Sequence, residues 1–141
     1  MPPSTDDRSP CRLCGATTAI RTPDGPACRV CGWRVGDAPD PDLPLPRVDV
    51  VYYLRYATRV KIGTSGTPRR RLAAIRHEEL LAFELGDRSV EQRRHREFAA
   101  LREGGEWFAL TEPLTTHIAR LRGDRDPWHD YARWFADALC R

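Results

Sequence analysis

Alternating hydrophobic and polar positions predict a two-stranded hairpin near the middle of the chain. In the segment 48–56 every even position is apolar or aromatic, whereas the odd positions include Asp49 and Arg55. A period of two is typical of a β-strand. The Ala57-Thr58-Arg59 stretch is suited to a turn, and 60–63 alternates again, with Val60 and Ile62 on either side of Lys61. We therefore predict that the two segments pair as antiparallel strands.

Helix and strand patterns follow one another after this hairpin. Thr67 is suited to an N-cap and Pro68 to the first helical position, and Ser89 to the cap of a later helix. The pair Gly104-Gly105 is expected to end that later helix. The predicted elements are, in order, a helix over 68–77, a strand over 80–85, a helix over 90–102, an extended segment over 106–110, and helices over 114–121 and from 126 onwards.

This order predicts an α+β fold with a small three-stranded sheet that begins with an antiparallel hairpin and is flanked by helices. A chain of 141 residues is long enough for one domain and a small additional module. Four prolines between 37 and 46 disfavour helix and strand pairing, so this segment is expected to be a linker. The predicted division is a disordered N-terminus 1–9, a small module 10–36, the linker 37–46, a main domain 47–122 and a C-terminal helical segment 123–141.

Four of the five cysteines form two CxxC pairs, namely Cys11 with Cys14 and Cys28 with Cys31. Two such pairs provide the tetrahedral set of thiolates that structural zinc prefers. The alternative is two disulfides in a secreted protein, but nothing in the polar start of the sequence signals export. We therefore expect a cytoplasmic protein with a structural Zn²⁺, which supplies much of the folding energy of this module.

Charge and hydropathy restrict the partners. No apolar run approaches the roughly 20 residues that cross a bilayer, so we expect no membrane association. The net charge is +3, and residues 55–102 hold 12 basic and 6 acidic side chains. This excess favours a polyanion, with Arg69, Arg70 and Arg76 as candidate phosphate contacts. We expect DNA as the partner, with RNA as an alternative, and either a monomer or a homodimer.

Five side chains have the chemistry required for phosphodiester hydrolysis: Tyr52, Lys61, Arg71, Glu91 and His95. The hairpin places Tyr52 and Lys61 on neighbouring strands, and Glu91 and His95 share one helix face. A carboxylate binds a hard divalent cation, and a guanidinium matches phosphate oxygens. The phenol, amine or imidazole can orient or deprotonate a water molecule. Together these groups suit metal-assisted hydrolysis.

The order and spacing of these residues resemble the GIY-YIG nuclease superfamily, in particular its small phage-type branch. The resemblance covers about residues 48–112. It implies a three-stranded sheet with flanking helices, one catalytic Mg²⁺ or Mn²⁺, and hydrolytic cleavage of DNA. The matching segments are Val50-Val51-Tyr52, Lys61-Ile62-Gly63, Arg71-Leu72, the pair Glu91 and His95, and Gly105-Glu106-Trp107-Phe108.

Within this resemblance, Tyr52 matches the first tyrosine of the family, Arg71 the helix arginine and Glu91 the metal-binding glutamate. His95 and the 106–108 run match features of the phage-type branch. Two departures bear on catalysis. Lys61 stands where many members have a second tyrosine, and lysine is ordinarily a protonated donor rather than a base. The chain also contains no asparagine, which many of these nucleases use.

Three functions follow as hypotheses. The first is a metal-dependent DNA endonuclease whose zinc ribbon helps to hold DNA. The second is a catalytically degenerate DNA-binding protein or regulator, and the third is an adaptor whose zinc ribbon docks a protein partner. Metal-dependent cleavage separates the first from the second, whereas salt-sensitive binding of nucleic acid separates both from the third.

Overall fold

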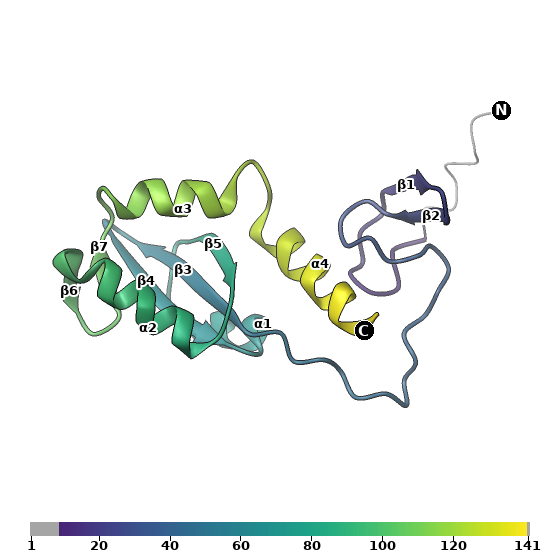
Figure 1. Ribbon diagram of the computed structural model, residues 1–141, viewed down its shortest axis with the longest axis horizontal. Helices are drawn as coiled ribbons and strands as arrows, with labels where there is room; N and C mark the ends of the chain where they lie inside the picture. The colour runs from purple at the N-terminus through teal and green to yellow at the C-terminus, as the bar shows by residue number, and fades with distance from the viewer. Residues whose placement is uncertain (1–8, 141) are drawn as a thin grey trace. The chain divides into compact units, whose positions relative to one another are not determined.

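The computed structural model describes residues 9–140 and divides into two compact units (Figure 1). One unit contains the described residues up to Pro46 together with those from His129 onwards, and the other is Arg47–Trp128. The predicted disordered segment 1–9 lies almost entirely outside the described residues. No helix in the described part of the chain has the length and apolar character needed to span a membrane.

The smaller unit has one hairpin and one helix. Strand β1 (Ala19–Thr22) pairs antiparallel with β2 (Gly25–Cys28), which ends at the third cysteine. Helix α4 (Pro127–Leu139) contributes all but its first two residues to this unit. The unit therefore combines segments from both ends of the sequence.

The larger unit is built on a five-stranded antiparallel sheet with the order β5-β3-β4-β7-β6. The α+β prediction is confirmed, but three strands were too few. The sheet gains β6 from a segment whose residues are all exposed and show no hydrophobic pattern. The strands are β3 (Val50–Tyr56), β4 (Arg59–Ser65), β5 (Glu79–Leu85), β6 (Arg102–Gly104) and β7 (Trp107–Ala109).

The helices of this unit differ from the predictions mainly at their ends. Helix α1 (Pro68–Ala73) is shorter than expected, and α2 (Arg88–Glu97) is capped by Asp87 rather than Ser89. The Asp87 carboxylate accepts a hydrogen bond from the Ser89 amide at 2.9 Å. A 3₁₀ turn (Ala99–Leu101) follows α2, and α3 (Leu114–Arg122) lies close to the predicted range. Helix ends are set by local capping contacts, which the hydrophobic pattern does not encode.

Strand β3 is covered on both faces, because Val50 to Leu54 are all buried. Tyr53 and Val51 belong to the core that α2, the 3₁₀ turn and α3 complete. Tyr52 lies opposite Gly63 and Phe83 in the two neighbouring strands, so these three residues share the other face. The strand therefore presents one tyrosine to each face of the sheet. The core beneath the helices comprises Val51, Tyr53, Val60, Ile62, Ala82, Phe98, Phe108, Leu114 and Ile118.

A polar network is embedded beside this core. The Tyr53 hydroxyl donates to Glu84 at 2.8 Å and lies 3.0 Å from Nε2 of His117. Arg94 donates to both oxygens of Glu84, at 3.0 and 2.5 Å. Burial opposes ionisation of Glu84, but hydrogen bonds from His117, Arg94 and Tyr53 outweigh it and hold its pKa at about 2. The carboxylate thereby links two strands to α2 and α3.

We predict that Glu84→Gln removes a pH-dependent part of the stability. Because the pKa of Glu84 in the folded chain lies below its ordinary 4.5, its stabilisation is present above about pH 4.5 and is lost as the pH falls towards 2. The loss by pH 3 is on the order of 2 kcal/mol. Urea unfolding at pH 7 and pH 3 measures it. E84Q should lose less free energy of unfolding than the wild type over this range, and an equal loss would contradict the prediction. Glu97→Gln, which changes an exposed partner of Arg94, is the control.

Candidate functional site

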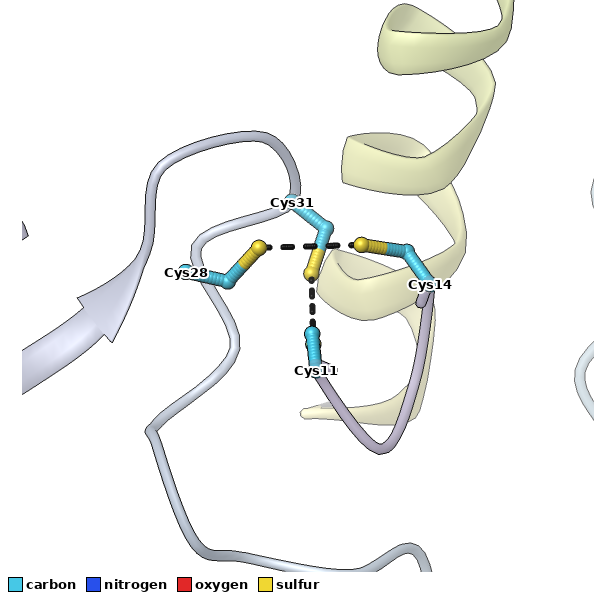
Figure 2. Close-up of side chains that lie close together, drawn as sticks. All are labelled: Cys11, Cys14, Cys28 and Cys31. Carbon is cyan, nitrogen blue, oxygen red and sulfur yellow. Dashed lines mark hydrogen bonds between the residues drawn. The ribbon is translucent and has the colours of Figure 1, made fainter. Parts of the chain in front are cut away.

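The two CxxC pairs converge on one point in the smaller unit, as Figure 2 shows. Their four sulfur atoms lie within 4.8 Å of one another. The sulfur atoms of Cys14 and Cys28 are 3.6 Å apart and those of Cys11 and Cys31 are 3.7 Å apart, far beyond the roughly 2.05 Å of a disulfide. The geometry therefore favours a metal ion over the disulfide alternative. The converging residues are Cys11, Cys14, Cys28 and Cys31.

Both pairs are held by the same local turn. Gly15 and Gly32 each donate a backbone hydrogen bond of 2.9 Å to the carbonyl of the first cysteine of their pair. Their φ angles are 82° and 80°, a conformation that side chains with a Cβ rarely adopt. In each pair a backbone amide two residues beyond a cysteine donates to its sulfur at 3.4 Å. The turns thus direct the sulfur atoms of the two pairs towards one another.

The cluster is positioned to bind a metal ion and is consistent with structural zinc. Burial and the neighbouring thiols raise the pKa of Cys31. A cation among the four sulfur atoms would reverse this effect, because it stabilises the thiolate form. Four thiolates also complete a tetrahedral coordination sphere, which leaves no position for substrate. A metal ion bound by all four sulfur atoms would therefore be consistent with a structural role.

Helix α4 packs directly on the cysteine cluster. Its small residues Ala132 and Ala136 are buried against Cys28 and Cys31. Arg133 donates to two backbone carbonyls of the second CxxC turn, at 3.3 and 3.1 Å. The sequence analysis treated the C-terminal helix as a segment of its own, whereas its packing makes it part of the metal-binding unit. Nothing in the hydrophobic pattern of the helix specified this partner.

Metal removal is therefore expected to unfold α4 together with β1 and β2, while the five-stranded sheet persists. Hydrogen exchange with and without a zinc chelator measures this, and metal analysis should find about one zinc per chain. Cys11→Ser should reproduce the effect of the chelator. Cys140→Ser, which alters the exposed fifth cysteine, is the control. Protection of α4 that survives complete metal removal would contradict the coupling.

The larger unit contains an open pocket of about 480 Å³ at the open end of the β3–β4 hairpin, away from its turn. Three of the five predicted catalytic residues, Tyr52, Arg71 and Glu91, line it together. The lining also includes Arg88 and Glu106, which the sequence analysis did not assign a role. Side chains from two strands, two helices and a loop thus meet in one polar concavity.

Tyr52 is held in this pocket by close packing against the neighbouring strand. It lies opposite Gly63, where an added Cβ would overlap the phenol ring and its oxygen. Burial raises the pKa of Tyr52, although the adjacent Arg71 guanidinium acts in the opposite direction. The hydroxyl therefore stays protonated at neutral pH and can donate a hydrogen bond.

Glu91 is the one charged residue that is buried within the described part of the chain, at 8% exposure. Its carboxylate accepts a hydrogen bond from the Thr64 hydroxyl. His95 Nε2 lies 3.6 Å from the other carboxylate oxygen and 2.8 Å from the carbonyl of Ile62. His95 does not line the pocket, so it contacts the Glu91 carboxylate from the side that faces away from the pocket. Glu91 is thus fixed in position while it still faces the pocket.

Lys61 does not line the pocket, but it forms an ion pair with Glu106, which does. Its Nζ lies 3.6 Å from a carboxylate oxygen of Glu106 and 5.8 Å from the centre of the Trp107 ring. Glu106 is positioned by the pairing of β4 with the segment before β7, where its carbonyl accepts the Ile62 amide at 3.0 Å. The 105–108 run stood out in the sequence as a match to the nuclease pattern. The sequence did not indicate that this run pairs with β4.

The three arginines predicted to contact phosphate do not line the pocket. The Arg69 guanidinium lies 4.6 Å from the centre of the Trp128 ring, and that of Arg76 lies 5.3 Å from the centre of the Tyr56 ring. Arg70 is exposed. Two of the three are therefore partly engaged with aromatic side chains.

A catalytic divalent cation would find few protein ligands in the pocket. Among the described residues, the four cysteines are the only group of three or more side chains arranged to hold a metal. The pocket offers the Glu91 carboxylate, with Thr64 and Asp87 also in its lining. Mg²⁺ commonly binds through one or two carboxylates and completes its shell with water and phosphate oxygens. Glu91 would supply one such carboxylate.

Comparison with known proteins found no match: no protein-family model, no curated protein and no solved structure corresponds significantly to this chain. The resemblance to GIY-YIG nucleases therefore stays a prediction from residues and spacing. Function has to be inferred from the chemistry of the cysteine cluster and of the pocket.

Gly63→Ala provides a test of the packing that holds Tyr52. The added methyl group would overlap the phenol, so β4 or Tyr52 must move, and we expect a loss of about 1–3 kcal/mol in the free energy of unfolding. Urea denaturation measures this loss. Ser65→Ala in the same strand is the matched control. Equal stability of the two variants would show that the site tolerates a side chain.

Proposed function

We propose that the 47–122 segment is a metal-dependent endonuclease domain that hydrolyses DNA phosphodiester bonds, and that the zinc ribbon aids DNA binding. The observation that carries this proposal is the convergence of Tyr52, Arg71 and Glu91 in one open, polar pocket. These residues lie on a strand and two different helices, and they are the ones that the resemblance to GIY-YIG nucleases marks as catalytic. No wall of the pocket closes it against a large substrate, which suits a polymer.

Each of the three side chains has a distinct role in this proposal. Arg71 is exposed beside Tyr52 and directs its guanidinium to a bound phosphate, whose extra charge in the transition state it stabilises. Glu91 would hold Mg²⁺ or Mn²⁺, and such a cation supplies charge neutralisation at the phosphate when bound. Tyr52 donates its hydroxyl proton in a hydrogen bond and orients the attacking water or a phosphate oxygen.

Electrostatics support a nucleic-acid substrate. Residues 55–102 carry a net charge of +6, from 12 basic and 6 acidic side chains. Arg88 adds a further cation to the pocket lining beside Arg71. In the cysteine unit, Arg12 and Arg29 are exposed within the two CxxC turns, which supports a contribution of the ribbon to phosphate binding.

A second candidate function is DNA binding without turnover. It is favoured by Lys61, which pairs with Glu106 instead of lining the pocket. In that arrangement the lysine cannot replace the missing second tyrosine as a group that acts on water. The basic surface and the phosphate-binding guanidinium would then serve a regulator rather than a nuclease.

A nuclease assay on supercoiled plasmid separates the two candidates. Zinc-loaded protein is incubated with Mg²⁺, with Mn²⁺ or without added divalent cation. We expect nicking or cutting that requires the cation. Glu91→Gln removes the charge that holds the cation, and Arg71→Ala removes the phosphate contact, so each should lower the rate by about 10²-fold or more.

The matched control for E91Q is Glu103→Gln, because Glu103 is an exposed glutamate of the same unit outside the pocket. This variant should keep the wild-type rate. Folded wild type that retards DNA in a gel without cutting it would establish the binder. Cleavage that E91Q leaves unchanged would refute the role of Glu91.

A further inference from the structure

Helix α2 carries a basic face that the rest of the larger unit does not neutralise. Arg88, Arg93 and Arg96 are all exposed. None of them forms an ion pair or a side-chain hydrogen bond within the part of the chain that the structure describes. Some other arginines of the unit are paired with carboxylates. Arg55 contacts Glu78 and Glu79 at 3.3 and 3.2 Å.

Helical geometry places these arginines on one side. At about 3.6 residues per turn, Arg88, Arg93 and Arg96 fall within an arc of roughly 140° around the axis. Glu91 and Phe98 point to the opposite, buried side. The only acidic residue of α2 outside that buried side is Glu97, and Arg94 holds it at 2.8 Å. The face is therefore uniformly positive, and we call it the α2 arginine face.

The α2 arginine face is continuous with the pocket. Arg88 belongs to both, since it lines the pocket beside Glu91 and opens the exposed row on α2. From Arg88 to Arg96 the helix rises about 12 Å. This length corresponds to about three to four base pairs of B-DNA at 3.4 Å per step. A duplex whose phosphate enters the pocket thus has further cations along the adjoining helix.

We propose that the α2 arginine face binds the phosphate backbone of double-stranded DNA and leads it into the pocket. The choice of DNA as the occupant rests on the proposed function, and the charge of the face rests on the fold alone. Contacts of this kind position a duplex without reading its sequence. The face is distinct from Arg69, Arg70 and Arg76, the arginines that the sequence pattern selected.

The test measures the affinity of the zinc-loaded full chain for a 20-base-pair duplex over a series of salt concentrations. No divalent cation is added beyond the bound zinc. Each lost phosphate contact lowers the slope of log K against log salt by about 0.9. The variant R93A/R96A should therefore reduce the slope by about 1.8 and weaken binding at low salt. These residues lie outside the pocket lining, so the variant leaves the pocket intact.

Single substitutions provide the matched control. Arg96→Ala should reduce the slope by about 0.9. Arg120→Ala removes the same charge from an exposed position on α3 and should leave the slope unchanged. An equal effect of the two variants would mean that net charge alone drives binding, and it would overturn the proposal.

The remaining outcomes separate this inference from the proposed function. Plasmid cleavage that depends on Glu91, together with an unchanged slope in R93A/R96A, would overturn the α2 face and leave the nuclease standing. A reduced slope without any cleavage would support the face and remove the nuclease. Failure of the wild type to bind duplex would overturn the proposal, as would arginine-dependent binding to phosphatidylserine vesicles in place of DNA.

Discussion

The register between β3 and β4 is the constraint on which the larger unit depends. It places Tyr52 opposite Gly63, where only the missing Cβ leaves room for the phenol. Strand β4 also carries Thr64, which donates to the Glu91 carboxylate, and its pairing with β7 places Lys61 opposite Trp107. A slip of one residue would exchange the two faces of the strand and dismantle the pocket. Packing and chemistry are thus set by one hairpin.

Glu84 and Glu91 are both largely withdrawn from solvent, but their surroundings differ. One carboxylate is paired within the fold, and the other stays available to a ligand. Glu84 receives hydrogen bonds from Tyr53 and Arg94 and lies close to His117, so its charge is fully compensated. Glu91 is buried as well, yet no arginine or lysine contacts it in the described chain, and it faces an open pocket. A cation or a substrate can complete the environment of Glu91 but has no place beside Glu84. That difference, rather than burial itself, distinguishes a candidate site from a structural network.

The cysteine unit has a small core that is built differently from the apolar core of the larger unit. Its hairpin strands are four residues each, and Cys28 is the only one of these eight residues that is buried. The four sulfur atoms and the two alanines of α4 form its centre instead. Metal coordination by this cluster would replace much of the apolar burial that a larger domain uses. Since α4 comes from the far end of the chain, the unit also ties the two ends of the sequence together.

Local sequence determined β3, β4 and β5, the order of the elements of the larger unit and the identity of the clustered cysteines, because alternation, capping residues and CxxC spacing act over a few neighbours. It also singled out Tyr52, Arg71 and Glu91 through their order along the chain. Tertiary structure alone decided that Glu106 pairs with Lys61, that β6 extends the sheet and that α4 packs on the cysteine cluster. It also decided which arginines are stacked or paired and which stay exposed. These features depend on contacts between residues distant in sequence, for which the pattern of one segment carries no signal.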